Sequence, residues 1–147
     1  MTKPSIREMG PEDRETWAWL YDQIFPGLSL KGRLSEIDRV IATPDAAAYV
    51  AEEGGVAIGF AEYACRAYAN GCNSKPVPFL EAIWVAETAR RQGLARALIT
   101  TIEDRVRAEG HREMGSDVDL DNDLGLTAHR GLGFEETERV VYFRKDL

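Results

Sequence analysis

The sequence has 147 residues, of which 44% are hydrophobic and 29% charged, and this composition suits a single folded domain over residues 1–147. Its formal net charge of -7 argues against nucleic-acid binding, which requires a basic face. No apolar run is long enough to span a bilayer and the first residues do not resemble a signal peptide, so we expect a cytoplasmic protein without a membrane role.

The first half of the chain has the patterns of one strand, two helices and a hairpin. We expect, in order, a strand Ser5–Met9, a helix from Gly10–Asp13 to Pro26-Gly27, a helix Leu30–Ile41, and strands Ala46–Glu52 and Val56–Ala64. Glu53-Gly54-Gly55 between these two strands is a strong hairpin signal, because glycine adopts the backbone conformations that tight turns need.

The second half continues with a central strand and a long helix. We expect a polar loop Arg66–Pro78, a strand Phe79–Val85, a helix beginning at Leu94, a strand Glu113–Val118, a helix Asp123–Leu132, and one or two strands within Phe134–Phe143. Leu94, Leu98, Ile102 and Val106 recur every fourth residue and form one apolar face of the long helix. This order predicts the α/β class, with a mixed central sheet flanked by helices.

The turn between the central strand and the long helix is basic and contains one glycine: Arg90-Arg91-Gln92-Gly93-Leu94-Ala95. The small residues Gly93 and Ala95 let a phosphate approach the free N–H groups at the helix start, where the helix dipole and two arginines also favour an anion. A dinucleotide fold needs more glycines than this turn has, and a P-loop needs a Gly-Lys-Ser/Thr sequence that is missing. We therefore predict a pyrophosphate site at the carboxyl end of the strand.

The pattern Arg90-x-x-Gly93-x-Ala95, after a strand ending in Trp84-Val85, resembles the acetyl-CoA signature of the GNAT N-acetyltransferases. The expected order of strands and helices is also the GNAT order, so the resemblance implies a GNAT-like fold with acetyl-CoA as cosubstrate. In it, backbone groups of the central strand pair with the pantetheine arm. The cofactor-binding residues that the resemblance implies are Ile83, Val85, Arg90, Arg91, Gln92, Gly93, Ala95 and Asn122.

Further blocks resemble a narrower group, the aminoglycoside 6'-N-acetyltransferases of the dimeric chromosomal type. The blocks are Val56–Ala61, Tyr68–Cys72, Phe79–Glu81, Arg112–Asp117 and Leu132–Val140. The resemblance implies direct transfer of acetyl from acetyl-CoA to the 6'-amine of an aminoglycoside, a cationic small molecule, and thereby antibiotic resistance. It also implies a homodimer, in which Val140–Arg144 would be an exchange or edge strand.

Glu81 is a carboxylate in an otherwise apolar strand, a position that costs free energy unless the group is paired or functional. By the resemblance it is catalytic: it binds the reactive amine and draws its proton away, directly or through water. A structural carboxylate bonded to a neighbouring strand or arginine is the alternative. Asp117, at the end of the fifth strand, would bind substrate ammonium groups or else cap the following loop.

Phe25, Tyr68 and His129 complete the site that the resemblance implies. Phe25 stands on the substrate side where relatives have tryptophan. Tyr68 matches a family tyrosine that lines the substrate cleft; the alternative is that Tyr68 is a surface residue that packs on its own loop. His129 occupies the place of the tyrosine that protonates the leaving thiolate in many GNAT enzymes. An imidazole can donate a proton near neutral pH as a catalytic acid, or it can pack against the cofactor.

A metal site is not expected. The two cysteines, Cys65 and Cys72, and two distant histidines lack zinc-site spacing, and without a secretion signal both thiols are expected to be reduced rather than bridged. Alternating aspartates follow Asp117, but an EF-hand loop starting there needs glycine and glutamate where the chain has Asn122 and Ala128.

Two other functions remain open on the sequence. One is acetylation of a different amine, such as a polyamine or a peptide terminus, and the other is a CoA-binding sensor without catalysis. Glu81 and Asp117 argue against the sensor, because a protein that only binds CoA has no need of carboxylates beside the thioester.

Overall fold

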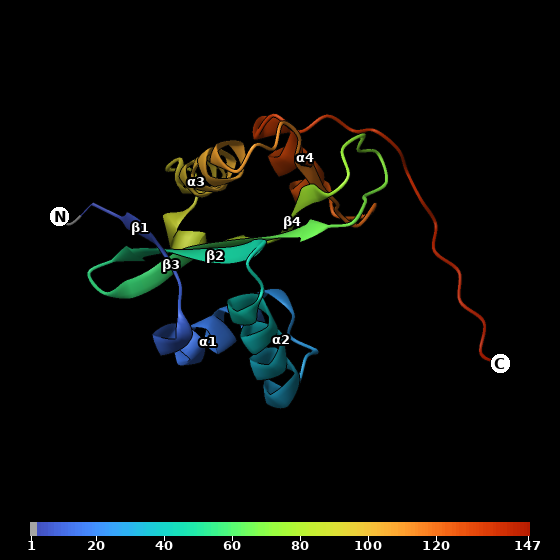
Figure 1. Ribbon diagram of the computed structural model, residues 1–147. Coiled ribbons are helices and arrows are strands. Elements are labelled where there is room, and N and C mark those ends of the chain that lie inside the picture. Colours follow the sequence, from blue (N-terminus) through green and yellow to red (C-terminus); the bar gives the residue numbers. More distant parts are fainter. Residues whose placement is uncertain (1–2) are drawn as a thin grey trace.

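A computed structural model describes residues 3–147 and shows one five-stranded sheet covered by helices on both faces (Figure 1). The strands follow one another across the sheet in chain order: β1 (Ser5–Glu8), β2 (Ala46–Glu53), β3 (Val56–Arg66), β4 (Val77–Val85) and β5 (Gly115–Ser116). The first three pairs are antiparallel and the last, β4 with β5, is parallel. The sheet is therefore mixed, as the sequence predicted.

The helices form two layers, with α1 and α2 against one face of the sheet and α3 and α4 against the other (Figure 1). Their bounds are α1 (Arg14–Ile24), α2 (Leu30–Ala42), α3 (Leu94–Ala108) and α4 (Asp123–Gly131), with short 3-10 turns η1 (Pro11–Asp13) and η2 (Glu87–Ala89). Trp17, Leu20 and Ile37 fill the core under α1 and α2. Leu98 and Ile102, from the apolar face predicted for the long helix, fill the core under α3. The strands and helices predicted up to the end of α3 are confirmed to within a few residues.

A β-bulge interrupts the pairing of β3 with β4 at Glu81. Glu62 lies opposite Ala82 and the next residue of β3, Tyr63, lies opposite Leu80, so Glu81 is the extra residue without a partner. Leu80 packs with the α3 core, whereas Ala82 packs with the α1 and α2 core, although the two are only two residues apart. The bulge therefore reverses which side of the sheet each later side chain of β4 faces, and it re-aims the side chain at its own position.

The strand β5 is shorter than predicted, with two residues in place of Glu113–Val118. It pairs with β4 only through Gly115 and Ser116, while β4 continues to Val85. Across the described residues, no strand lies beside this last part of β4 on that edge of the sheet. The parallel pair therefore opens beyond Leu80 and leaves backbone groups of β4 free to bind another extended chain.

The prediction of one or two strands within Phe134–Phe143 is wrong for the single chain. Residues 132–147 form neither helix nor strand; Leu132 and Phe134 still pack against the core under α3, and the chain then runs away from the body of the molecule toward its C-terminus (Figure 1). Val141, Tyr142 and Phe143 are 73%, 83% and 91% exposed. A strand exists only where a neighbour supplies the ladder of hydrogen bonds, and this segment lies beside none.

Candidate functional site

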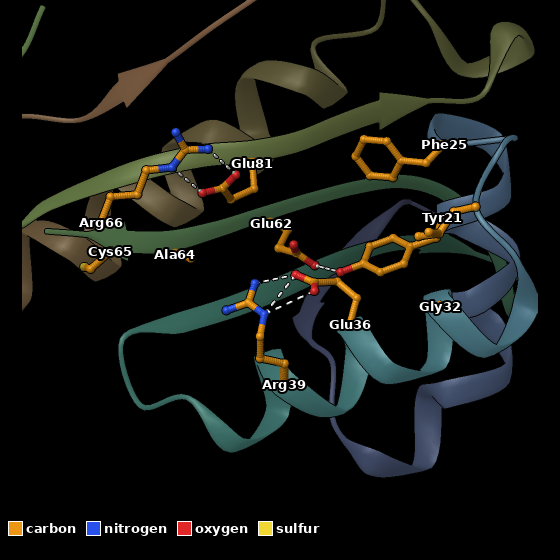
Figure 2. Close-up of a pocket in the computed structure, with 11 residues that line it drawn as sticks. Tyr21, Phe25, Gly32, Glu36, Arg39, Glu62, Ala64, Cys65, Arg66 and Glu81 are labelled. Carbon is orange, nitrogen blue, oxygen red and sulfur yellow. Dashed lines mark hydrogen bonds and ion pairs between the residues drawn. The ribbon is translucent and has the colours of Figure 1, made fainter. Parts of the chain in front are cut away.

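A cavity of about 550 Å³ lies between α1, α2 and the strands β3 and β4 (Figure 2). Its lining includes Tyr21, Phe25, Glu36, Glu62, Arg66 and Glu81. Two of the predicted substrate-binding residues, Phe25 and Glu81, are thus brought to one cavity. Phe25 contributes an apolar edge and packs on Tyr21 with ring centroids 5.8 Å apart.

Glu81 forms a bidentate ion pair with Arg66 of the neighbouring strand β3 (Figure 2). The Arg66 Nη2 donates to Glu81 Oε2 at 2.8 Å and its Nε donates to Oε1 at 2.9 Å, while the guanidinium carbon lies 3.6 Å from the centre of the Phe79 ring. The arginine partner foreseen as the structural alternative for Glu81 is therefore present. The carboxylate nevertheless keeps 26% of its side-chain surface exposed at the cavity, where a ligand can reach it.

The pKa of Arg66 is raised, first by its hydrogen bonds to Glu81 and, to a smaller extent, by the nearby charge of Asp117. Asp117 is exposed just after β5 and so adds negative charge at the Arg66 end of the site. Tyr68 is 66% exposed, and neither it nor Asp117 lines the cavity. The structure thus places Asp117 near Arg66, the partner of Glu81, and leaves Tyr68 on the surface of its loop.

Two further carboxylates, Glu36 and Glu62, line the cavity, and neither is among the site residues predicted from the sequence. Glu36 on α2 pairs with Arg39 one turn later on the same helix. Glu62 on β3 is only 4% exposed and accepts a hydrogen bond from the Tyr21 hydroxyl at 2.5 Å. Burial raises the pKa of Glu62 to about 7. A single acid inside the apolar run of β3 is the same signal that drew attention to Glu81, and it identifies Glu62 equally well.

The predicted phosphate turn has the expected geometry at the N-terminus of α3. Gly93 has a φ of 79° and Arg91 a φ of 63°, so both lie in the left-handed region. Within residues 3–147, no side chain caps the first N–H groups of α3, whereas Ser29 caps α2 and Asn122 caps α4. A side chain at Gly93 would meet no atom within 4 Å, so the turn opens to solvent and leaves room for a phosphate.

Arg90 and Asn122, two predicted cofactor ligands, have structural partners. The Nε of Arg90 donates to the carbonyl of Val85 at 3.0 Å and ties the turn to the end of β4. Asn122 Oδ1 accepts a hydrogen bond from the N–H of Gly125 at 2.9 Å. Arg91 and Gln92 are exposed at the turn itself. The open backbone N–H groups there and the free edge of β4 near Ile83 can hold an elongated phosphate-containing ligand.

His129 on α4 is held at both ring nitrogens. Its Nδ1 lies 2.7 Å from the carbonyl oxygen of Gly125 and its Nε2 lies 2.7 Å from the hydroxyl oxygen of Ser116. A carbonyl can only accept, so Nδ1 carries the hydrogen, and in the neutral ring Nε2 accepts a hydrogen bond from the Ser116 hydroxyl. The ring also packs on Phe134, with centroids 5.2 Å apart. His129 therefore fastens α4 to the end of β5.

Over residues 3–147, no helix is both long enough and apolar enough to cross a membrane. The same residues contain no group of three or more histidine, cysteine or acidic side chains placed to hold a metal ion. Both cysteines, Cys65 and Cys72, are free thiols, as expected.

Three features meet at β4: an opened pair of parallel strands, an uncapped helix N-terminus with a glycine turn, and an acidic cavity. Together they define an N-acetyltransferase that uses a CoA thioester. The model of the acetyltransferase (GNAT) family matches residues 13–134. The chain belongs to the GNAT family, which confirms the fold and the family resemblance seen in the sequence.

Full-length relatives are aminoglycoside acetyltransferases. The chain is 40% identical over 141 residues to aminoglycoside N(6')-acetyltransferase type 1 of Salmonella enteritidis, covering 95% of this chain and 97% of that protein. It matches the structure of AAC(6')-Iy in complex with the bisubstrate analogue CoA-S-monomethyl-acetylneamine with a TM-score of 0.93, at 38% identity and covering 99% of this chain and 100% of that one. It matches AAC(6')-Ih from Acinetobacter baumannii with a TM-score of 0.92, at 32% identity and 99% coverage of both chains.

Proposed function

We propose that this protein transfers the acetyl group of acetyl-CoA to the 6'-amine of aminoglycosides and thereby confers resistance to them. The observation that carries the proposal is the cavity rich in carboxylates beside Glu81, in a chain whose full-length relatives bear that activity in their names. Aminoglycosides are polycations, and clustered carboxylates attract such ligands. Because acetyl-CoA is made inside the cell, the activity also favours a cytoplasmic location.

We infer that Glu81 binds the ammonium group that reacts and receives its proton, directly or through water. An amine attacks a carbonyl only after it has lost a proton, so an acceptor beside the reactive nitrogen speeds the reaction. Arg66 binds both oxygens of Glu81 and fixes their position at the edge of the cavity. Phe25 would supply an apolar wall, and Asp117 and Tyr68 would extend the binding surface outward. The engagement of both nitrogens of His129 favours the packing role over proton donation.

Acetyl-CoA supplies an activated acetyl group when it is bound. We infer that Arg91, Gln92, Gly93 and Ala95 hold its pyrophosphate at the start of α3, and that the free edge of β4 at Ile83 and Val85 pairs with its pantetheine arm. Arg90 would keep the turn in place through its hydrogen bond to the Val85 carbonyl. Asn122 would cap the start of α4 by accepting a hydrogen bond from the N–H of Gly125.

Release of free CoA with different amines tests this function. Kanamycin and tobramycin are expected to give turnover at least ten times faster, in kcat/KM, than spermidine or a peptide with a free terminus, because only they fill a cavity with several carboxylates. Turnover with spermidine but with no 6'-amino compound would overturn the aminoglycoside proposal. Tight CoA binding without turnover of any amine would instead favour a sensor.

We also propose that the protein forms a homodimer through its C-terminal segment. The exposed side chains Val140, Val141, Tyr142 and Phe143 form a continuous apolar stretch on a segment that extends away from the body. In water such a stretch is unfavourable, and burying it against a second copy would contribute about 1.5–3 kcal/mol for each large side chain. Addition of the segment to the sheet of the partner would also supply the ladder that a strand requires.

Truncation of the chain after Glu138 tests the homodimer. Sedimentation equilibrium is expected to give the mass of two chains for the full-length protein and of one chain for the truncated protein, with dimer affinity lowered by about 100-fold or more. Removal of only Lys145–Leu147, which spares the apolar stretch, serves as the control and is expected to leave the dimer intact. A single-chain mass for the full-length protein would contradict the proposal.

A further inference from the structure

Glu62 differs from the other carboxylates that line the cavity in forming no ion pair within residues 3–147 (Figure 2). Glu81 is paired with Arg66, and Glu36 is paired with Arg39. The Glu62 carboxylate accepts a hydrogen bond from the hydroxyl of Tyr21, and the buried indole N–H of Trp17 lies close enough to lower the pKa of Glu62. Both guanidinium groups that line the cavity are therefore already committed to other acids.

Burial without an ion pair makes the charged form of Glu62 costly. The side chain is 4% exposed, and its removal from water is the largest cause of the rise in its pKa to about 7. The negative charges of Glu36 and Glu81 raise the pKa further, whereas the Tyr21 hydroxyl acts in the opposite direction. A buried carboxylate of this kind gains most when a cation comes to it, and here an open cavity leads to it.

We propose that Glu62 is the counter-ion of a second ammonium group of the substrate, distinct from the amine that is acetylated. This inference rests on the proposed aminoglycoside activity. Glu81 is turned toward Arg66 at one end of the cavity, and Glu62 is turned toward Tyr21 on the side that α1 and α2 cover (Figure 2). Two carboxylates with different partners on adjacent strands suit two amines on one molecule. Glu62 thereby favours aminoglycosides with several amines over compounds that carry only the reactive amine.

The pairing makes substrate affinity depend on the ionisation of Glu62. Its charged form predominates only above its pKa of about 7, so affinity for a second ammonium is expected to rise between pH 6 and pH 7.5. The charged and titratable groups that line the cavity with Glu62 are Tyr21 from α1, Glu36 and Arg39 from α2, Cys65 and Arg66 from its own strand, and Glu81 from β4. Of these, the pKa of Tyr21 is raised far above this range and the pKa of Glu36 is lowered below it.

Replacing Glu62 by glutamine tests the inference, because the amide keeps the shape and removes the charge. Calorimetry at pH 7.5 is expected to show kanamycin affinity lowered by about 10- to 100-fold, with the increase between pH 6 and pH 7.5 abolished. CoA affinity is expected to be unchanged. Glu15→Gln removes one charge from an exposed position on α1 away from the cavity and is expected to bind kanamycin as the unmodified protein does.

A substrate with one amine separates this role from a role in catalysis. With 6-amino-6-deoxyglucose, which carries only the reactive amine, Glu62→Gln is expected to keep kcat/KM within about twofold of the unmodified protein. An equal loss with kanamycin and with this monoamine would overturn the inference, and so would unchanged kanamycin binding. Absence of kanamycin binding by the unmodified protein would instead overturn the proposed function itself.

Thermal unfolding provides a readout that does not depend on substrate. The folded-state pKa of Glu62 lies above the ordinary value of 4.5, so its contribution to stability is complete below pH 4.5 and is lost as the pH rises through about 7. Glutamine does not ionise. The Tm of Glu62→Gln minus that of the unmodified protein is therefore expected to increase as the pH rises from 5 to 8. A Tm difference that does not change with pH would show that Glu62 carries no buried charge, and would contradict the inference.

Discussion

Glutamine in place of Glu81 is expected to lower kcat/KM for kanamycin by about 100-fold or more, a range typical of the loss of a group that accepts a proton in the reaction. The amide cannot take the proton from the amine, and it cannot neutralise the ammonium that we propose binds at Glu81. The loss is expected in kcat as well as in KM, because the proton moves during the chemical step. Steady-state CoA release at pH 7.5 measures both.

Two other variants make the result specific to the chemistry of Glu81. Aspartate at this position keeps the carboxylate but shortens its reach, and it is expected to give an activity between those of glutamate and glutamine. Glu15→Gln removes an equal charge from the exposed face of α1 and is expected to leave kcat/KM unchanged. Full activity of Glu81→Gln would contradict a catalytic role and leave Glu81 with only its structural role as the partner of Arg66.

The sequence marks Glu81 as a candidate site residue, but the geometry around it could not be predicted. A lone acid in a strand otherwise made of apolar residues marks the position, because an unpaired buried charge is costly. The bulge that places it depends on how β3 and β4 are aligned, and a shift of one residue leaves no signature in composition or periodicity. The Arg66 partner depends on that same register. It could be foreseen only as one alternative among several.

Patterns that depend on one segment alone were predicted best. The turn before α3 and the apolar face that begins at Leu94 are local features, and both are confirmed. The segment around Val140–Phe143 has the residues of a strand, yet a strand also requires a neighbour, and the single chain provides none. Glu62 was missed for a different reason: it carries the same signal as Glu81, but no motif drew attention to it.

Aspartate in place of Gly93 is expected to weaken CoA binding by about 100-fold, through two effects that act together. The left-handed backbone at Gly93, with a φ of 79°, costs a side chain-bearing residue about 1–2 kcal/mol. A carboxylate at the start of α3 would also repel the pyrophosphate that we propose binds there, where the helix dipole otherwise attracts an anion. Calorimetric titration with CoA measures the change.

Gly110 offers a matched control at the other end of the same helix. It too has a positive φ, 94°, and a side chain added there would meet no atom within 4 Å. Gly110→Asp therefore introduces a similar backbone strain and the same charge about a helix length away from the turn. Both variants are expected to lose stability, and only Gly93→Asp is expected to lose CoA affinity. Equal CoA affinities for the two variants would place the pyrophosphate elsewhere, because backbone strain alone would then account for every effect of the substitution.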